Sequence, residues 1–473
     1  MMKKTTLALL LSATLPMAAL AADPMPFPLS NLTVKDGAKV EINQFKDAKN
    51  CKGCHPRQFK GWQGSMHSIA FIDPVFQAEW AMGETETQGA TRNLCGGCHT
   101  ALGTVTQTVE FKSESGKYGG FTTQGAATQG VSCEVCHSVV DTNISKTANG
   151  EHGNASLALA ADGAKRGPLS DAKSFGHKVV YSELHTKSEF CANCHNVFNP
   201  VHDSFPLEHT YQEWKNSPYA KAEIQCQDCH MVPVDTAIRV ADEMKPAKDL
   251  KDHGLGGKAG MGGKPRALVH DHNFVGGNAV VAPLLGVPGA QAHADEAKKR
   301  LQTAAELDTR ISGKQDAPVL EVTVYNRRAG HALPTSLTFI RQVWLEVVIT
   351  DNQGKELLRS GSLQADNSLP ENTVIFQDTA VDVHGKLEHK PWKVAKFSHQ
   401  NTIPAKGSRT VAYPFTLPNG VTDYQVNVKL HYRSFDQSVA DLLLEDKITV
   451  PAIEMSQRQQ QYRGTTAITG HQG

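Results

Sequence analysis

The segment Cys51-Lys52-Gly53-Cys54-His55 carries the pattern Cys-x-x-Cys-His, which decides how this chain of 473 residues is interpreted. The pattern occurs five times, and its copies contain all 10 cysteines. With 21 histidines in the chain, five unrelated Cys-x-x-Cys pairs would each be followed by His roughly once in several million sequences. This excludes a free-thiol enzyme and argues against a disulfide scaffold or a zinc ribbon. The copies are Cys51/Cys54/His55, Cys95/Cys98/His99, Cys133/Cys136/His137, Cys191/Cys194/His195 and Cys226/Cys229/His230.

Cys-x-x-Cys-His is the attachment signature of c-type haem. Residues at i, i+3 and i+4 share one face of a helical turn, so two thiols can add to one porphyrin while the imidazole reaches its iron. We therefore expect five covalently bound haem c groups, attached through the ten cysteines. The expected proximal iron ligands are His55, His99, His137, His195 and His230.

The composition and the N-terminus indicate a globular exported protein. The 48 basic residues balance 48 acidic ones and 20% of residues are charged, which excludes a disordered chain and gives no sign of nucleic-acid binding. Lys3 and Lys4 precede a short apolar stretch and the small-residue site Ala19-Leu20-Ala21, which predicts a secretory signal peptide over residues 1–21. The apolar stretch is too short to span a bilayer, so we expect a periplasmic or extracellular protein without membrane insertion.

The motifs divide the chain into regions. All five lie between residues 51 and 230, so we expect a loop-rich, mainly α haem domain over residues 22–240 with closely packed haems. Residues 241–316 form a Gly-rich connector followed by a helix near 292–309. The Gly-rich part is not a phosphate loop, because Pro265 follows Lys264 where Ser or Thr is required, and a flexible surface loop is the better interpretation.

The C-terminal region changes to a period of two. Leu320, Val322 and Val324 alternate with polar residues, and similar runs follow, which predicts an all-β sandwich of Ig-like type over residues 317–455. This region contains no cysteine and therefore no haem of its own. We expect residues 456–473 to form a polar, frayed tail.

The second axial ligand of each iron sets its chemistry. Two histidines leave an iron able only to pass electrons, whereas an open position lets a small molecule bind. His331 lies between Gly330, which we expect to allow a backbone shape that other residues resist, and Pro334, which stiffens the far side. We expect this turn to present the imidazole of His331 to a haem of the N-terminal domain. His270 and His272 could also be a zinc pair, although no further ligands cluster with them in the sequence. The candidates for the distal position are His67, His177, His185, His270, His272 and His331.

The haem region resembles the multihaem cytochromes of the cytochrome c-554 family. The matching pieces are Cys51 to His67 with its Trp62/Ser65/His67 ending, Gly130 to His137, Ser188 to His195, Tyr211 to Met231, His272 to Gly276 and Gly330 to Thr335. The resemblance implies stacked, mostly bis-histidine haems and periplasmic electron transfer. It also implies that His67, His177, His272 and His331 are distal ligands, with His185 and His270 as weaker candidates. Two features depart from relatives: five motifs exceed the four of the smallest members, and the Cys-x-x-Cys-Lys motif usual in pentahaem nitrite reductases is missing.

Three functional hypotheses follow. The first is a periplasmic electron-transfer cytochrome of an anaerobic-type respiratory chain, whose partners are a quinol-oxidising membrane cytochrome or a terminal reductase. The second is a haem enzyme that reduces a small nitrogen or sulfur oxyanion at one open iron. The third is an assembly role, in which the β-domain docks to a partner or makes a homo-oligomer. The motifs favour electron transfer over catalysis.

Overall fold

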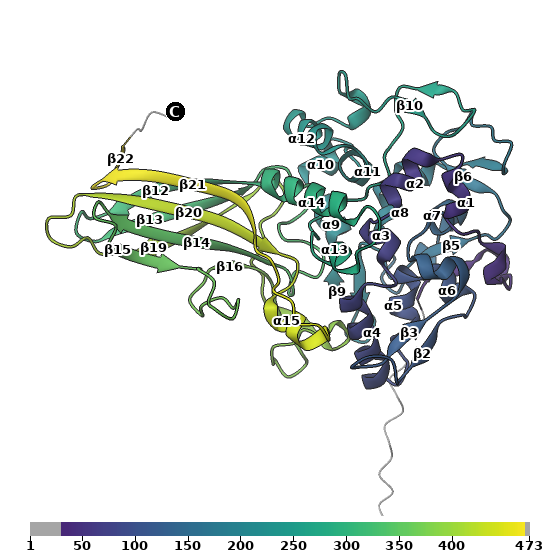
Figure 1. Ribbon diagram of the computed structural model, residues 1–473, viewed down its shortest axis with the longest axis horizontal. Coiled ribbons are helices and arrows are strands. Elements are labelled where there is room, and N and C mark those ends of the chain that lie inside the picture. Colours follow the sequence, from purple (N-terminus) through teal and green to yellow (C-terminus); the bar gives the residue numbers. More distant parts are fainter. Residues whose placement is uncertain (1–29, 469–473) are drawn as a thin grey trace, which may run out of the picture.

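The computed structural model describes residues 30–468 and has two lobes. A loop-rich lobe of short helices contains the N-terminal half, and a β-lobe of long strands extends from it (Figure 1). Within the described residues, no helix combines the length and apolar character that a bilayer-spanning segment needs. The expected signal peptide, residues 1–21, lies outside the described residues.

The helices of the haem lobe are short because the chain turns repeatedly around the Cys-x-x-Cys-His motifs. The longest, α4 (Pro74–Glu86), has 13 residues and begins at Asp73, whose carboxylate accepts hydrogen bonds from the N–H groups of Val75 and Phe76. The others are α1 (Lys49–Lys52), α2 (Pro56–Trp62), α3 (Met66–Ile69), α5 (Arg92–His99), α6 (Ala101–Val105), α7 (Cys133–Ser138), α8 (Ser188–Ala192), α9 (Thr210–Lys215), α10 (Pro218–Lys221), α11 (Cys226–His230) and α12 (Val234–Glu243).

Small sheets of two or three strands fill the space between these helices. They are β1 (Thr33–Val34) with β5 (Leu157–Leu159) and β4 (Val139–Thr142), β2 (Glu110–Lys112) with β3 (Gly120–Thr122), β6 (Lys165–Gly167) with β7 (Val179–Tyr181), β8 (Val197–Asn199) with β9 (Phe205–Glu208), and β10 (Gly257–Lys258) with β11 (Pro265–Arg266).

Two helices lead from the haem lobe to the β-lobe. They are α13 (Val281–Leu285) and α14 (Ala290–Ala304), and α14 buries Ala290, Ala294, Ala297 and Leu301 on one face. The expected helix at 292–309 therefore exists, but it ends at Ala304 because the next residues pair as a strand.

The β-lobe contains two antiparallel sheets that share one apolar core. The first sheet has the order β12 (Ala305–Gly313), β13 (Pro318–Asn326), β19 (Ser408–Pro414). The second has the order β15 (Glu356–Ser360), β14 (Gln342–Asp351), β20 (Asp423–Arg433), β21 (Ile453–Arg463), β22 (Thr466–Ile468), with β16 (Ile375–Phe376) also on β14. Outside them lie β17 (Thr379–Val381), β18 (Lys396–His399) and α15 (Gln437–Leu443). In β13 the residues Leu320, Val322 and Val324 are fully buried, as the alternation predicts.

Two boundaries differ from the expectation. The first sheet begins at Ala305, because β12 pairs with β13 over its whole length, so the connector does not extend to residue 316. The expected frayed tail is wrong for residues 456–468, since β21 pairs along β20 and β22 pairs with β21. Polar side chains suit this strand, because Gln457, Gln459 and Gln461 face solvent while Met455 and Tyr462 enter the core. Residues 469–473 lie outside the described residues.

Candidate haem attachment sites

Each Cys-x-x-Cys-His motif coils into one turn that brings its histidine back beside its first cysteine. In the first motif the N–H of His55 donates to the carbonyl of Cys51 at 2.8 Å, and in the fourth the N–H of His195 donates to Cys191 at 3.0 Å. All ten cysteines have free, partly buried thiols. This is the donor set that covalent attachment of haem requires.

The five motif histidines each have one ring nitrogen engaged by the protein. Four contact backbone carbonyls through Nδ1, which leaves Nε2 free to bind a metal, the usual arrangement of a ligating imidazole. These contacts are His55 to Ala259 at 2.7 Å, His99 to Ala70 at 3.0 Å, His137 to Arg166 at 2.6 Å and His230 to Val275 at 2.8 Å.

The fifth motif histidine, His195, differs because its partner is a carboxylate. Its Nδ1 lies 3.3 Å from Oε1 of the buried residue Glu208. Burial opposes protonation of His195, but the hydrogen bond to Glu208 and the negative charges of Glu208, Cys194 and Cys226 together raise the pKa of the imidazole to about 9. A carboxylate partner makes an imidazole more basic and therefore a stronger ligand.

Most of the remaining candidate ligands are held neutral. Burial lowers the pKa of His67, His230 and His272 to about 3 and that of His99 to about 4. A neutral imidazole is the form that binds a metal. The buried Nδ1 atoms of His67 and His272 have no hydrogen-bond partner, so these rings are not engaged as ordinary core histidines would be.

Four motif histidines each face a histidine from a distant part of the chain. If a metal were bound between two imidazoles, bonds of about 2.0–2.1 Å on each side and roughly 1 Å from each nitrogen to its ring centre would place the ring centres about 6 Å apart. The observed separations of ring centroids match this value. They are His55–His177 at 6.2 Å, His195–His67 at 6.1 Å, His137–His272 at 6.3 Å and His230–His331 at 6.2 Å.

Local contacts explain how α3 presents His67. Trp62 donates its indole N–H to the carbonyl of Val131 at 2.8 Å, and the N–H of Val131 donates to the carbonyl of His67 at 2.9 Å. Gly130 has a positive φ of 58°, and a Cβ there would lie 2.6 Å from the oxygen of His67, so only glycine fits. Ser65 caps α3 by accepting from the N–H of Ser68. These contacts orient His67 toward His195 of the fourth motif, although the first motif is nearest in sequence.

His331 reaches the fifth motif from the β-lobe. Its carbonyl accepts from Asn326 at 2.8 Å, and the N–H of the next residue, Ala332, donates to Glu213 of α9 at 3.0 Å. Gly330 has no positive φ, and a Cβ there would make only ordinary contact with Tyr219 at 3.6 Å. The expectation that Gly330 supplies an unusual backbone shape is therefore wrong, and hydrogen bonds fix the turn instead.

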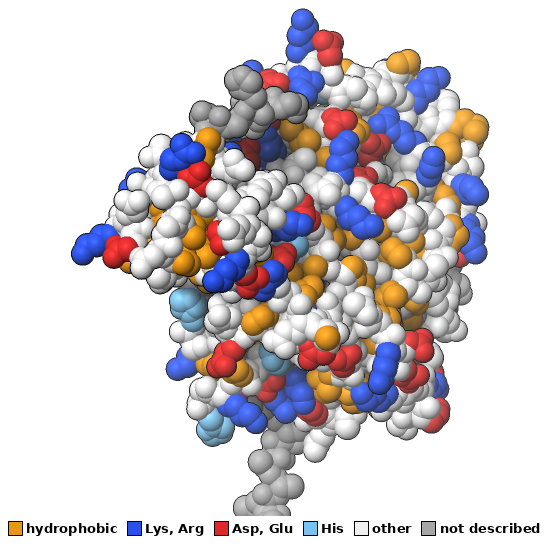
Figure 2. Space-filling view, turned by 60° about the vertical axis from the view of Figure 1, so that its left-hand side comes forward, with side chains coloured by type: hydrophobic (Ala, Val, Ile, Leu, Met, Phe, Trp, Pro, Cys, Tyr) orange, Lys and Arg blue, Asp and Glu red, His pale blue; other side chains and the backbone are white. Residues whose placement is uncertain are grey.

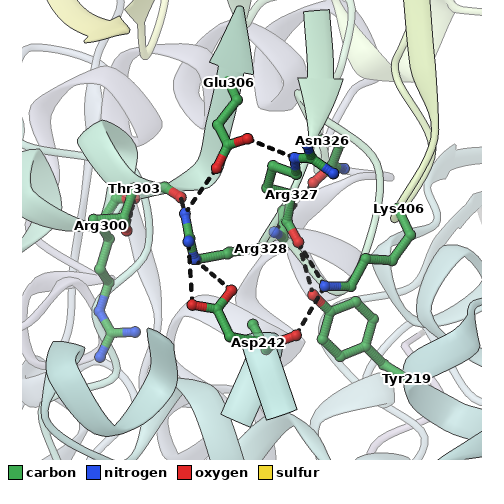
Figure 3. Close-up of polar contacts among 11 residues, drawn as sticks. Tyr219, Asp242, Arg300, Thr303, Glu306, Asn326, Arg327, Arg328 and Lys406 are labelled. Carbon is green, nitrogen blue, oxygen red and sulfur yellow. Dashed lines mark hydrogen bonds and ion pairs between the residues drawn. The ribbon is translucent and has the colours of Figure 1, made fainter. Parts of the chain in front are cut away.

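Charged contacts pin the same turn to the haem lobe, as Figure 3 shows. Arg328 forms a two-pronged ion pair with Asp242 of α12, through Nε at 2.8 Å and Nη2 at 3.1 Å. Lys406 of the β-lobe donates both to the carbonyl of Arg327 and to that of Ala241 on α12, each at 2.8 Å, while Arg327 pairs with Glu306 of β12 at 2.6 Å within the β-lobe.

Two weaker distal candidates have other surroundings. The ring of His185 lies 5.7 Å from that of His137, but its Nδ1 contacts Ser182 at 2.9 Å and its Nε2 contacts the carbonyl of Cys136 at 3.1 Å, so both nitrogens are engaged. His270 faces none of the five motif histidines. Within residues 30–468 no group of three ligand-type side chains is placed to hold a metal ion, so the zinc interpretation of His270 and His272 gains no support.

The second motif has a different environment. In the described part of the chain no second imidazole faces His99 at the spacing of the other four pairs. Instead the ring of Phe76 stacks on His99, with centroids 3.5 Å apart and planes 4° apart. Trp80, Phe71 and Phe121 pack around Cys95 of the same motif in an apolar cluster. Nothing in the sequence indicated that Phe76 stacks on His99, because packing between aromatic rings has no sequence pattern. Nor did the sequence indicate the backbone carbonyls that contact the motif histidines, since every residue has a carbonyl.

The motifs lie close to one another through their thiols. The thiols of Cys51 in the first motif and Cys133 in the third lie close enough that each shifts the pKa of the other. The fourth motif contacts two others, through Cys194 to Cys98 of the second and through Cys191 to Cys226 of the fifth. Cys191 also interacts electrostatically with Cys136 of the third motif, so neighbouring attachment points run through the whole lobe.

Comparisons with known proteins agree with this picture. Residues 50–138 match the family model described as Cytochrome c554 and c-prime. The chain is similar in fold to a penta-heme cytochrome c552 from Thermochromatium tepidum, with a TM-score of 0.60 and 16% identity, over 89% of this chain and 100% of that one. No curated protein matches the sequence.

Two glycosidases are similar to a smaller part of the chain. They are a glycosyl hydrolase family 2 member from Bacteroides cellulosilyticus, with 10% identity and a TM-score of 0.16, and beta-glucosidase 3B from Thermotoga neapolitana, with 11% identity and a TM-score of 0.12. Each match covers 34% of this chain; it covers 14% of the glycosyl hydrolase and 16% of the beta-glucosidase. With TM-scores this low, neither match indicates anything about this chain.

The motifs, their geometry and the family match define the class. Residues 50–138 match the cytochrome c554 family and the chain has the fold of a penta-heme cytochrome, so the resemblance to multihaem c-type cytochromes of that family, predicted from the sequence, is confirmed. Proteins of this class bind haem c covalently and exchange electrons with redox partners.

Proposed function

We propose that this protein is an exported pentahaem cytochrome whose main function is electron transfer. Five attachment motifs with ten free cysteines support the haem count. The observation that carries the proposal is the set of four facing imidazole pairs, each with ring centroids 6.1–6.3 Å apart. Bis-histidine ligation saturates an iron and leaves it able only to gain or lose an electron. His67, His177, His272 and His331 are therefore the proposed distal ligands.

The thiol contacts support a branched arrangement of the five sites. The first and third motifs adjoin, and the fourth adjoins both the second and the fifth. The third and fourth interact electrostatically through Cys136 and Cys191. Closely spaced sites allow electrons to pass between the ends of the lobe without a diffusing carrier, as expected of a periplasmic respiratory chain. The predicted signal peptide supports periplasmic export, and the partners by this proposal are a quinol-oxidising membrane cytochrome or a terminal reductase.

The experiment that tests this proposal counts haems and electrons on the mature protein. Mass spectrometry after expression with the attachment machinery should give an excess of five haems over the mature chain. Reductive titration should then require five electrons per chain. An excess of four haems or fewer would contradict the proposal, and so would an iron that takes up no electron.

We also propose that the β-lobe is an Ig-like sandwich. The order of its first sheet, β12-β13-β19, and the core order of its second, β15-β14-β20-β21, correspond to strands A-B-E and C′-C-F-G of that architecture. Its role here is to present His331 to the haem lobe. Removing it should cost the fifth motif its distal ligand although all attachment cysteines remain.

One observation favours a second function, reduction of a small nitrogen or sulfur oxyanion at the second motif. His99 faces no second imidazole within residues 30–468, which leaves one iron position for a small molecule. Glu79 lies on the same face of α4 as Phe76, three residues earlier, and interacts electrostatically with Cys95. Burial raises the pKa of Glu79 to about 7, so this carboxyl can supply a proton near neutral pH.

A further inference from the structure

One attachment site is built differently from the others, because a surface segment lies on each side of its histidine pair. The Gly-rich loop 254–266 lies against the first motif: the carbonyl of Ala259 contacts Nδ1 of His55 at 2.7 Å, and the N–H of Met261 donates to the carbonyl of Cys54 at 2.8 Å. A Cβ on Gly260 would lie 2.7 Å from the ring of His55, so glycine is required for this approach. Segment 171–178 carries His177 on the other side.

These two segments form one continuous surface, which we call the motif 1 surface. Arg266 pairs with Asp171 at 2.6 Å and Lys264 pairs with it at 3.5 Å, which joins the segments. A Cβ on Gly262 would lie 3.7 Å from the ring of Phe175. In Figure 1 the strand β10 lies near α2 and β6, at the end of the molecule away from the β-lobe. The surface is therefore open to a partner without obstruction by the sheets.

The centre of the motif 1 surface is apolar and exposed. Phe175 is 82% exposed and Met261 is 63% exposed, although both side chains would gain free energy by burial. Single exposed apolar side chains are common, but these two come from adjoining segments directly beside an attachment site. Aromatic and methionine side chains are enriched where protein partners meet.

The rim of the motif 1 surface is basic. The two segments, 171–178 and 254–266, contain five basic residues and one acidic residue, Asp171. The ion pairs of Asp171 with Lys264 and Arg266 already offset part of its negative charge. The chain as a whole has 48 residues of each sign, so this concentration is local. Two haem propionates at the first motif would reduce the excess without reversing it. The basic residues are Lys173, Lys178, Lys258, Lys264 and Arg266.

We propose that the motif 1 surface is the docking site for an acidic redox protein that carries one electron at a time. This inference rests on the proposed electron-transfer function and adds where the electron enters or leaves. An apolar centre with a charged rim suits a short-lived complex, because the charges speed encounter while a small contact area lets the partner leave. In each encounter the partner is oxidised by one electron and one ferric iron of this protein becomes ferrous, with no bond or proton change; the reverse step runs when the partner is the acceptor.

The test uses the full-length holoprotein and reduced flavodoxin, an acidic one-electron donor, as the probe. The rate of haem reduction is measured by stopped flow over a range of ionic strength. The variant combines Lys173→Glu, Lys258→Glu and Lys264→Glu. All three lysines are exposed, and each is at least four residues from any proposed ligand in the sequence. Lys258 precedes Ala259, but the substitution keeps the backbone carbonyl of Ala259 that contacts His55. The matched control is Lys355→Glu with Lys386→Glu and Lys447→Glu, exposed lysines of the β-lobe with the same change in net charge.

The wild-type rate should fall steeply with added salt, and the motif 1 variant should be about tenfold slower at low salt with a nearly flat salt dependence. The β-lobe control should stay within about twofold of wild type. Equal rates for the two triple variants would overturn the docking proposal. Reduction by dithionite, which needs no docking site, tests the electron-transfer function separately. If dithionite fails to reduce five irons, the proposed electron-transfer function is contradicted, whatever the docking result.

Vesicles containing anionic lipid test the other class of occupant. Wild-type protein should not bind them more tightly than the motif 1 variant does. Vesicle binding that the variant loses, together with an unchanged flavodoxin rate, would show that a lipid surface occupies this face and would overturn the proposal.

Discussion

His331 of the β-lobe and His230 of the haem lobe face each other with ring centroids 6.2 Å apart and planes 13° apart. The two residues are 101 positions apart in the sequence and belong to different lobes. A haem held between them would join the lobes by an iron–nitrogen bond in addition to the packing and ion pairs. The β-lobe would then be part of the redox chain although it contains no cysteine.

Replacement of His331 by Ala should convert one low-spin iron to high spin while all five haems remain attached. The reason is that removal of one axial imidazole weakens the ligand field of that iron alone. Electron paramagnetic resonance of the oxidised protein measures the change. His185→Ala is the matched control, because both ring nitrogens of His185 already contact the protein, and its spectrum should keep the wild-type count of low-spin irons. The assignment fails if His331→Ala leaves the count unchanged or His185→Ala lowers it.

The ion pair between Arg328 and Asp242 should help to hold His331 in place. Arg328→Ala should lower the free energy of unfolding by about 1 kcal/mol, since the pair is partly exposed. It should also raise the fraction of molecules with a detached His331 roughly fivefold, seen as growth of the high-spin charge-transfer absorption band on warming. Arg359→Ala removes a comparable pair with Glu356 inside the β-lobe and should leave this band unchanged. If the high-spin band is the same in Arg328→Ala and Arg359→Ala, the ion pair of Arg328 contributes only to the stability of the fold and does not hold His331 in place.

Glu208 should lower the reduction potential of the iron at the fourth motif. Its carboxylate strengthens His195 as a ligand and favours the ferric state, which carries more positive charge. Glu208→Gln keeps the shape of the side chain but removes the charge, so one potential should rise by roughly 60 mV, equivalent to a tenfold change in relative stability. Potentiometric titration followed optically measures this. Tyr211→Phe removes a neighbouring hydroxyl that bonds Glu189 instead and should leave all five potentials in place. A variant Glu208→Gln with unshifted potentials would contradict this role.

The carboxyl of Glu79 should give any reduction at the second motif a defined pH dependence. Burial raises its pKa to about 7, so the proton is present below pH 7 and is lost as the pH rises through that value. Nitrite reduction should therefore slow above pH 7, and Glu79→Gln should remove this limb and lower the rate below pH 7 several-fold. Steady-state rates with a chemical reductant between about pH 5 and 9 test this. Identical profiles for the two proteins would remove Glu79 from the chemistry.

The sequence predicted the attachment motifs and a change from helical to alternating patterns along the chain, and its family resemblance implied four distal candidates, whose ligation of iron stays a prediction. It could not predict which histidine faces which motif, because the pairing depends on tertiary contacts. His67 lies 12 residues after His55 yet faces His195, since Trp62 and Gly130 turn α3 toward the fourth motif. The carbonyl partners of Nδ1 have no signature, because every residue has a carbonyl.

The errors at the edges of the β-lobe have a common cause. β12 and β21 carry many polar side chains, so their alternation is weak, and residues up to Thr309 also fit a continued helix. Both strands form because their backbones pair with strongly apolar neighbours, β13 and β20. Local patterns therefore locate the strongly apolar strands well and the polar strands β12 and β21 poorly.

Spin counting by electron paramagnetic resonance on the oxidised full-length protein tests the central claim most directly. The four facing imidazole pairs predict four low-spin ferric irons per chain, and the environment of His99 predicts one high-spin iron. Five low-spin irons would show that the iron of the second motif also has two strong axial ligands, which would exclude the proposed open position there. Two or more high-spin irons would contradict the proposed pairing of His67, His177, His272 and His331 with the motif histidines.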